Sequence, residues 1–185
     1  MAILATSASS AAPSSGNITV AFIMVGFDDQ DFQEEYDNDY FEETAFGSTN
    51  SMWDYFDEVS KGSLNIEGEV FGPYTLDGDA ADYSSGSSFV RESVEIADDD
   101  IYYPNFDAVV AIHSGPGGES SGDSNDIWSA HWPSITINTD DEDEDGDDHV
   151  IRRISQVPEY QLSNGERNPL GVWCHEFGHE LGLPD

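Results

Sequence analysis

Two histidines and a glutamate near the carboxyl end of the chain have the types and the spacing of a metal-dependent hydrolytic site. His175 and His179 are four residues apart, so on a helix both imidazoles project from one face and can bind one metal ion. Glu176 lies beside them, where it can accept a proton from a water molecule. The sequence therefore predicts one catalytic zinc ion, with Glu176 as the general base.

The residues after His179 predict a third ligand. Gly182 can adopt the left-handed conformation that ends a helix, and Pro184 cannot continue one. We therefore expect the chain to turn sharply and to carry Asp185 back toward the metal. Zinc accepts a carboxylate oxygen beside two imidazoles, and three protein ligands leave a fourth position open for water, as catalytic zinc sites do.

A helix must position these side chains, and the sequence predicts that it begins near residues 168–169. Asn168 can cap it, and proline is well placed at a first helical position. Cys174 projects about 100° away from His175 around the helix, so we interpret it as a packed thiol and not as a ligand. The apolar stripe of the helix consists of Leu170, Trp173, Phe177 and Leu181.

The upstream pattern alternates between strands and helices. This order predicts an α/β (α+β) domain with a mixed sheet. We expect buried strands at 17–27 and 106–113, a half-exposed strand at 63–71, helices at 48–62 (with Met52, Phe56 and Val59 on one face) and 89–97, a loop at 72–88, and strands at 135–137 and 150–154 around an acidic hairpin tip at 140–148.

The composition is strongly acidic. Asp and Glu number 39 against 5 Lys and Arg, a formal charge of -34, so binding to nucleic acid or to an anionic membrane is excluded. The 37% hydrophobic and 12% aromatic content nevertheless predicts a folded chain. Because the acidic residues are spread along the whole length, we infer a protein that works in molar salt, where a Debye length of ~3 Å screens their repulsion.

The ends of the chain differ in character. Residues 1–17 are rich in Ala and Ser and resemble a flexible leader or a signal remnant, whereas residues 18–185 carry the predicted domain. No stretch reaches the ~20 apolar residues that span a bilayer. The single cysteine excludes an intrachain disulfide.

Calcium is a second candidate cation, in a structural role. The Gly- and Asp-rich loop at 115–126 could bind it through Glu119, Asp123 and Asp126, although plain loop is the commoner outcome for such composition. The run at 140–148 has the opening spacing of a calcium hand, but Arg152 stands where the closing Glu should be. For His113, His131 and His149 we expect hydrogen-bonded structural roles, because the motif already supplies the metal ligands.

Three blocks in order resemble the immune inhibitor A family of secreted zinc metallopeptidases. They are residues 55–70, residues 106–119 with 126–129, and the metal-binding motif at 175–185, so the resemblance runs from about Ile18 to Asp185. It implies a metzincin-like catalytic domain with a twisted mixed sheet, long helices and the zinc-binding helix at the carboxyl end. It also implies an endopeptidase that acts on protein or peptide substrates, with His175, His179 and Asp185 as ligands. With the acidic composition, it suggests a haloarchaeal extracellular enzyme.

Two departures from the family pattern accompany this resemblance. Family members usually carry a propeptide, whereas here the first strand begins almost at once, and the chain stops on the expected third ligand, Asp185. We therefore expect a truncated catalytic domain that lacks its C-terminal subdomain and can be inactive by itself. Two other interpretations stay open: a non-catalytic, metal-stabilised domain of a halophilic surface protein, and an acidic calcium-binding module. The sequence gives no oligomeric state.

Overall fold

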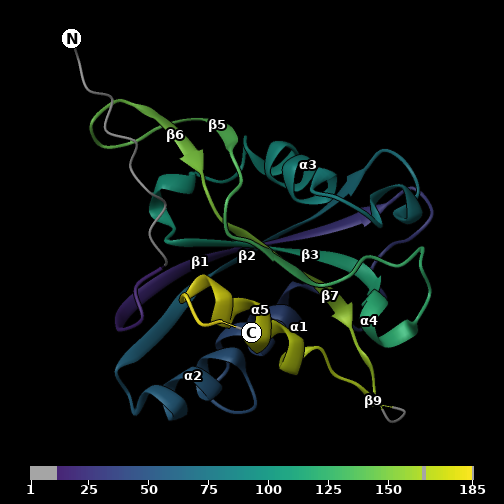
Figure 1. Ribbon diagram of the computed structural model, residues 1–185, viewed down its shortest axis with the longest axis horizontal. Helices are drawn as coiled ribbons and strands as arrows, with labels where there is room; N and C mark the ends of the chain where they lie inside the picture. Colours follow the sequence, from purple (N-terminus) through teal and green to yellow (C-terminus); the bar gives the residue numbers. More distant parts are fainter. Residues whose placement is uncertain (1–11, 164–165, 185) are drawn as a thin grey trace.

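The computed structural model describes residues 12–163 and 166–184 (Figure 1). In chain order its strands and helices are β1 (Gly16–Phe27), α1 (Asn38–Phe46), α2 (Met52–Ser60), β2 (Leu64–Leu76), the 3-10 turn η1 (Ala80–Tyr83), α3 (Ser88–Ala97), η2 (Tyr103–Asn105), β3 (Ala108–Pro116), α4 (Gly118–Ser121), β4 (Ala130–Trp132), β5 (Ile137–Glu142), β6 (Asp148–Ile151), β7 (Ile154–Tyr160), β8 (Leu162–Ser163), β9 (Glu166–Arg167) and α5 (Leu170–Glu180).

A five-stranded sheet in the order β2-β1-β3-β7-β4 forms the centre of the described structure. The first four strands are parallel, and β4 pairs with β7 in the antiparallel direction at the edge. This arrangement confirms the predicted mixed sheet, which is mostly parallel. The continuous apolar run of β1 suits its inner position, since a parallel strand covered on both faces has no polar side.

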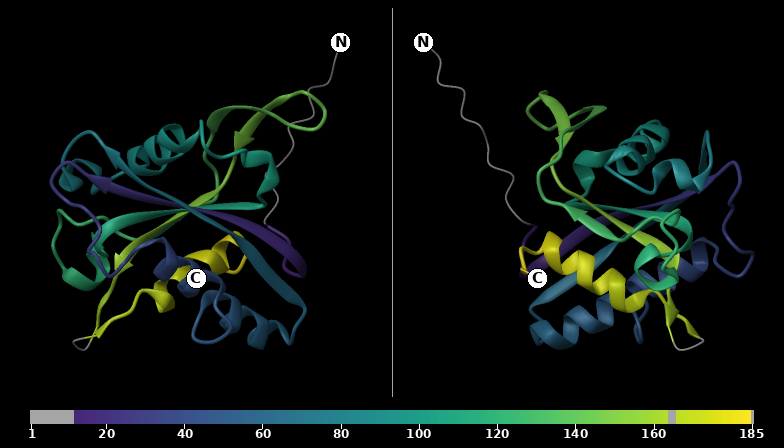
Figure 2. Two further views of the ribbon diagram at one scale, coloured as in Figure 1. Left: turned by 180° about the vertical axis from the view of Figure 1, so that it is seen from behind. Right: turned by 45° about the vertical axis from the view of Figure 1, so that its right-hand side comes forward.

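Helices cover both faces of the sheet. Figures 1 and 2 show α1, α2 and α5 on one face, and α3 with the β5-β6 hairpin on the other. Alternate residues of β1 divide between the two layers, because successive side chains of a strand point to opposite faces. Phe22 and Met24 pack beneath α1 and α5, whereas Ile23 and Val25 pack with Phe89 of α3.

Several boundaries differ from the sequence predictions. The helices of the described residues are not long: α5, the longest among them, has 11 residues. The chain leaves α2 through Lys61 and Gly62, both at positive φ (59° and 73°), so that helix is also short. Val59 is 55% exposed and does not belong to the apolar face of α2. The predicted loop after residue 71 is also wrong in part, because β2 continues to Leu76 beside β1.

The acidic hairpin and the strand that follows it lie at different residues from those predicted, which were strands at 135–137 and 150–154. The hairpin consists of β5 and β6, with Asp143–Asp147 at its turn, so part of the acidic run is strand and not tip. The segment after it is β7, an inner strand of the main sheet. In the described part of the chain, no helix is long and apolar enough to cross a membrane.

Candidate metal centre

The helix α5 is fastened to the sheet at its amino-terminal half. The side chain of Asn168 accepts a hydrogen bond from the backbone N of Leu170 (2.9 Å), but the N-cap residue of α5 is Pro169, which gives no side-chain cap, so the predicted cap at Asn168 is wrong by one residue. Trp173 is 1% exposed, and its indole N donates to the carbonyl of Pro158 in β7 (3.0 Å). The ring of Trp173 stacks on Phe22 of β1 with centroids 5.3 Å apart. These contacts fix the face of α5 that the predicted apolar stripe assigned to the core.

His175 and His179 come together on the opposite side of α5. Their Nε2 atoms are 3.3 Å apart, and their rings meet edge to face. Two imidazole nitrogens bound to one tetrahedral zinc at about 2.0–2.1 Å would be separated by about 3.3–3.4 Å. His179 Nδ1 lies 2.8 Å from the carbonyl oxygen of Leu183, which requires the proton on Nδ1 and leaves Nε2 as the electron-pair donor. The two residues therefore fit a zinc ion.

The chain turns immediately after this pair. Gly182 has a φ of 84°, and its backbone N donates to the carbonyl of His179 (2.9 Å), as expected for a glycine that ends a helix. The third predicted ligand, Asp185, lies outside the described residues. Within residues 12–163 and 166–184, no group of three or more His, Cys, Asp or Glu side chains gathers as a metal site.

Glu176 lies next to the histidine pair and is nearly buried, at 6% exposure. Burial raises the pKa of its carboxyl above the ordinary value, and the nearby His175 and His179 oppose that shift only in part. A carboxylate with a raised pKa binds a proton more readily near neutral pH, which suits a group that accepts and returns one.

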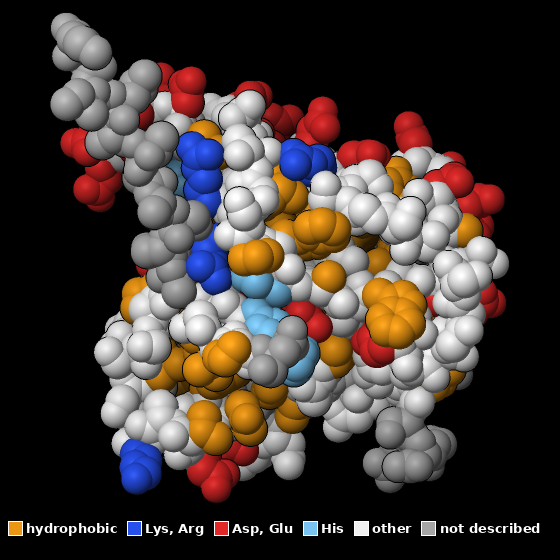
Figure 3. Space-filling model, in the orientation of Figure 1, with side chains coloured by type: hydrophobic (Ala, Val, Ile, Leu, Met, Phe, Trp, Pro, Cys, Tyr) orange, Lys and Arg blue, Asp and Glu red, His pale blue; other side chains and the backbone are white. Residues whose placement is uncertain are grey.

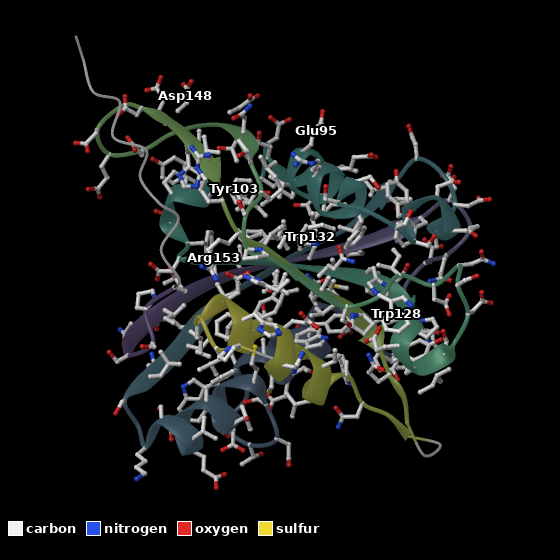
Figure 4. All side chains as sticks on the ribbon, in the orientation of Figure 1. Glu95, Tyr103, Trp128, Trp132, Asp148 and Arg153 are labelled. Carbon is white, nitrogen blue, oxygen red and sulfur yellow. The ribbon has the colours of Figure 1, made fainter. Side chains whose placement is uncertain are left out.

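A second group of polar residues lies next to His179, and the sequence did not predict it. It consists of His131 (β4), Arg153, Ser155 (β7) and Glu180 (α5), and we call it the Arg153 cluster. His131 stacks on His179 with centroids 5.9 Å apart. Figure 3 shows histidine side chains gathered on this face, between Lys or Arg side chains above and hydrophobic ones below, and Figure 4 shows Arg153 beside α5. His131 and Arg153 are 22 positions apart in the sequence, so no local pattern identified them as partners.

The other candidate residues have structural surroundings. Cys174 packs against the core, and burial raises the pKa of its thiol to about 12, so it is a poor nucleophile. Glu119, a predicted calcium ligand, accepts hydrogen bonds from the backbone N and Oγ of Ser129 and from Gln161. His113 is buried with Nδ1 2.9 Å from the Ser114 carbonyl, as expected for a structural histidine.

Comparison with known proteins agrees with this site. Residues 97–185 match the family model described as the catalytic domain of the immune inhibitor A peptidases, family M6. No curated protein matches the chain. The matched part runs from the end of α3 to the end of the chain, so it includes His131, Arg153 and the whole of α5.

Proposed function

Because residues 97–185 of this chain belong to the immune inhibitor A family of peptidases, we propose that the protein is a zinc-dependent endopeptidase. It hydrolyses peptide bonds in protein or peptide substrates with a water molecule that Glu176 deprotonates, on a metzincin-like fold. The observation that carries the proposal is the 3.3 Å separation of His175 Nε2 and His179 Nε2, with Glu176 beside them on the same helix.

The zinc ligands in this proposal are His175, His179 and Asp185. The turn after α5 supports the third one. Leu183 is held at the ring of His179 by its carbonyl oxygen, 2.8 Å from Nδ1. Asp185 follows Leu183 by two residues, which span at most about 7 Å, and on that ground we propose it as the third ligand. Its carboxylate then completes a set of three protein ligands.

The protein's own residues account for substrate activation and proton transfer. When bound, the zinc would polarise the scissile carbonyl and lower the pKa of a water molecule. The Glu176 carboxylate accepts a proton from that water as the water oxygen attacks the carbonyl carbon. Glu176 then gives the proton to the departing amide nitrogen when the C–N bond breaks. Its raised carboxyl pKa, caused by burial, favours the first of these transfers, in which Glu176 accepts the proton.

The edge of the sheet offers a place for the substrate backbone. β4 is the outer strand of the described sheet, and on its inner side it pairs with β7. An extended peptide can add to such an edge through main-chain hydrogen bonds. The indole of Trp128, two residues before β4, is 56% exposed, and Figure 4 labels it in the same view in which Figure 3 shows the histidine side chains. We propose that the substrate runs along β4 and contacts Trp128.

We further propose a secreted enzyme that works in molar salt. The family supports secretion, and the charge of -34 supports high salinity, because repulsion between the acidic side chains is screened there within ~3 Å.

The test is hydrolysis of casein in molar salt with added zinc, comparing the protein with its Glu176→Gln variant. The expected result is a loss of at least ~10²-fold in turnover with zinc still bound, since general acid–base catalysis contributes about 10²–10⁴-fold. Glu95→Gln is the matched control: Glu95 is an exposed residue of α3, so the same chemical change should leave turnover unaffected.

Two results would contradict the proposal. If Glu176→Gln cleaves casein as fast as the original protein, Glu176 is not the base. If the protein binds zinc but neither it nor a version extended past Asp185 cleaves, a non-catalytic, metal-stabilised domain is the better interpretation.

A further inference from the structure

We propose that the Arg153 cluster holds His179 in place for the metal, with Arg153 as the positioning residue that sets the zinc affinity. This inference rests on the proposed zinc site. Arg153 lies outside the metal-binding motif at 175–185, yet it contacts the backbone of the motif's second histidine, His179, and the side chain of the next residue, Glu180.

Arg153 reaches three parts of the site with one guanidinium group. Its Nη2 donates to the backbone carbonyl of His179 (2.9 Å) and lies 3.2 Å from Nε2 of His131. Its Nε is 3.5 Å from Oε2 of Glu180, an ionic contact without hydrogen-bond geometry. Arg153 therefore touches the backbone of His179, the side chain of the next residue, and the ring that stacks on His179.

His131 transmits this constraint to the ring of His179. Its Nδ1 lies 3.1 Å from both Oε1 of Glu180 and Oγ of Ser155, while its Nε2 faces Arg153. With both ring nitrogens engaged, the imidazole of His131 has one orientation. It stacks on His179 at an interplanar angle of 29°, and the Leu183 carbonyl holds His179 Nδ1. The ring of His179 is thus confined by His131 and by Leu183.

The charges of the cluster explain why an arginine is needed. The side chain of Glu180 is 2% exposed and that of Arg153 15%, so the two charges must compensate each other in a poorly hydrated place. Arg153 also bonds the His179 carbonyl at the carboxyl end of α5, where the helix dipole favours a cation. A planar guanidinium can serve several partners at fixed angles, which the single ammonium of lysine cannot do.

Arg153→Lys tests this role because the variant keeps the charge and changes only the geometry. We expect zinc affinity, measured by competition with a chromogenic chelator in molar salt, to fall by about 10–100-fold, the usual effect of removing a partner that orients a metal ligand. The visible spectrum of the cobalt-substituted protein should change as well, since it reports ligand geometry.

The matched control is Arg152→Lys. Arg152 is the preceding residue and is exposed, and its Nη1 contacts Thr136 Oγ1 at 3.3 Å, away from α5. This variant should keep the original zinc affinity and cobalt spectrum. The zinc affinities are compared at a temperature at which far-UV circular dichroism shows that all the metal-free proteins are folded.

Unchanged zinc affinity and an unchanged cobalt spectrum in Arg153→Lys would overturn the inference, as would equal losses in both variants. If Arg153→Lys does not fold, Glu180→Gln replaces it in the same test, because it keeps the side-chain shape and removes the charge that Arg153 faces. Unchanged zinc affinity in Glu180→Gln would also contradict the inference. If the original protein binds no zinc, the proposed function itself fails, and this result differs from a failure of Arg153 alone.

Discussion

Trp173 should contribute more to the stability of the fold than any exposed tryptophan, because it joins α5, the helix that carries the histidine pair, to the sheet. It is 1% exposed and stacks between Phe22 of β1 (5.3 Å) and Phe41 of α1 (5.6 Å). Its indole N–H also donates to Pro158 of β7. Replacing Trp173 by alanine removes its ring contacts with β1 and α1 and its hydrogen bond to β7 at once.

The expected loss of unfolding free energy for Trp173→Ala lies near the upper end of the range for truncated buried aromatic residues. Truncating a buried tryptophan costs about 3–5 kcal/mol. The lost indole hydrogen bond and the two stacked ring pairs, each pair worth about 0.5–1.5 kcal/mol, favour about 4–5 kcal/mol here. With a urea slope of about 2 kcal/mol per M, the unfolding midpoint should fall by about 2 M. Urea titration of the metal-free protein in molar salt, followed by far-UV circular dichroism, measures it.

Trp128→Ala supplies the control for this measurement. Trp128 is 56% exposed, so the same truncation should cost less than about 1 kcal/mol in unfolding free energy. A loss below about 2 kcal/mol for Trp173→Ala, or losses of equal size in the two variants, would show that Trp173 does not fasten α5 to the sheet.

Two further predictions concern pH and salt. Burial lowers the pKa of His113 from 6.5 to about 4, so folding favours the neutral ring. The neutral ring contributes on the order of 3 kcal/mol to the free energy of unfolding. This contribution is complete above pH 6.5 and is lost as pH falls toward 4. Urea unfolding at pH 4.5 and 7.5 should show a smaller pH-dependent loss in His113→Leu, and equal losses would be contradictory. Lowering salt from 2 M to about 0.1 M extends the Debye length to ~10 Å and should lower the melting temperature through repulsion among 39 acidic residues; an unchanged melting temperature would refute the halophilic interpretation.

The parts of the fold predicted correctly are those whose signal is local. β1 is a continuous apolar run, and α5 carries an apolar stripe that ends before Gly182, whose left-handed conformation is confirmed. The pairing of His175 with His179 follows from helix periodicity, so their convergence could be predicted without any other part of the chain. Asp185 lies outside the described residues, and its role stays a prediction.

β7 shows why the rest could not be predicted. It is an inner strand, yet its buried residues include Ser155, Gln156 and Glu159. Glu159 can be buried because the backbone N atoms of Gln33 and Gly115 donate to it, from residues 126 and 44 positions away. The same reason hid the Arg153 cluster, since Glu180 meets His131 and Arg153 only after β4, β7 and α5 have packed. Polar residues with distant partners leave no periodic signal in the sequence.

The acidic surface and the Arg153 cluster should respond differently to salt, and this difference matters for the proposed metal centre. Salt weakens interactions between exposed charges, but it screens buried pairs much less. The side chains of Arg153 and Glu180 are 15% and 2% exposed, so their attraction should persist in the molar salt in which we propose that the protein works. A chain with only five Lys and Arg residues thus places one of them where its charge remains effective. Zinc affinity should therefore vary little with salt concentration above the point at which the protein is folded.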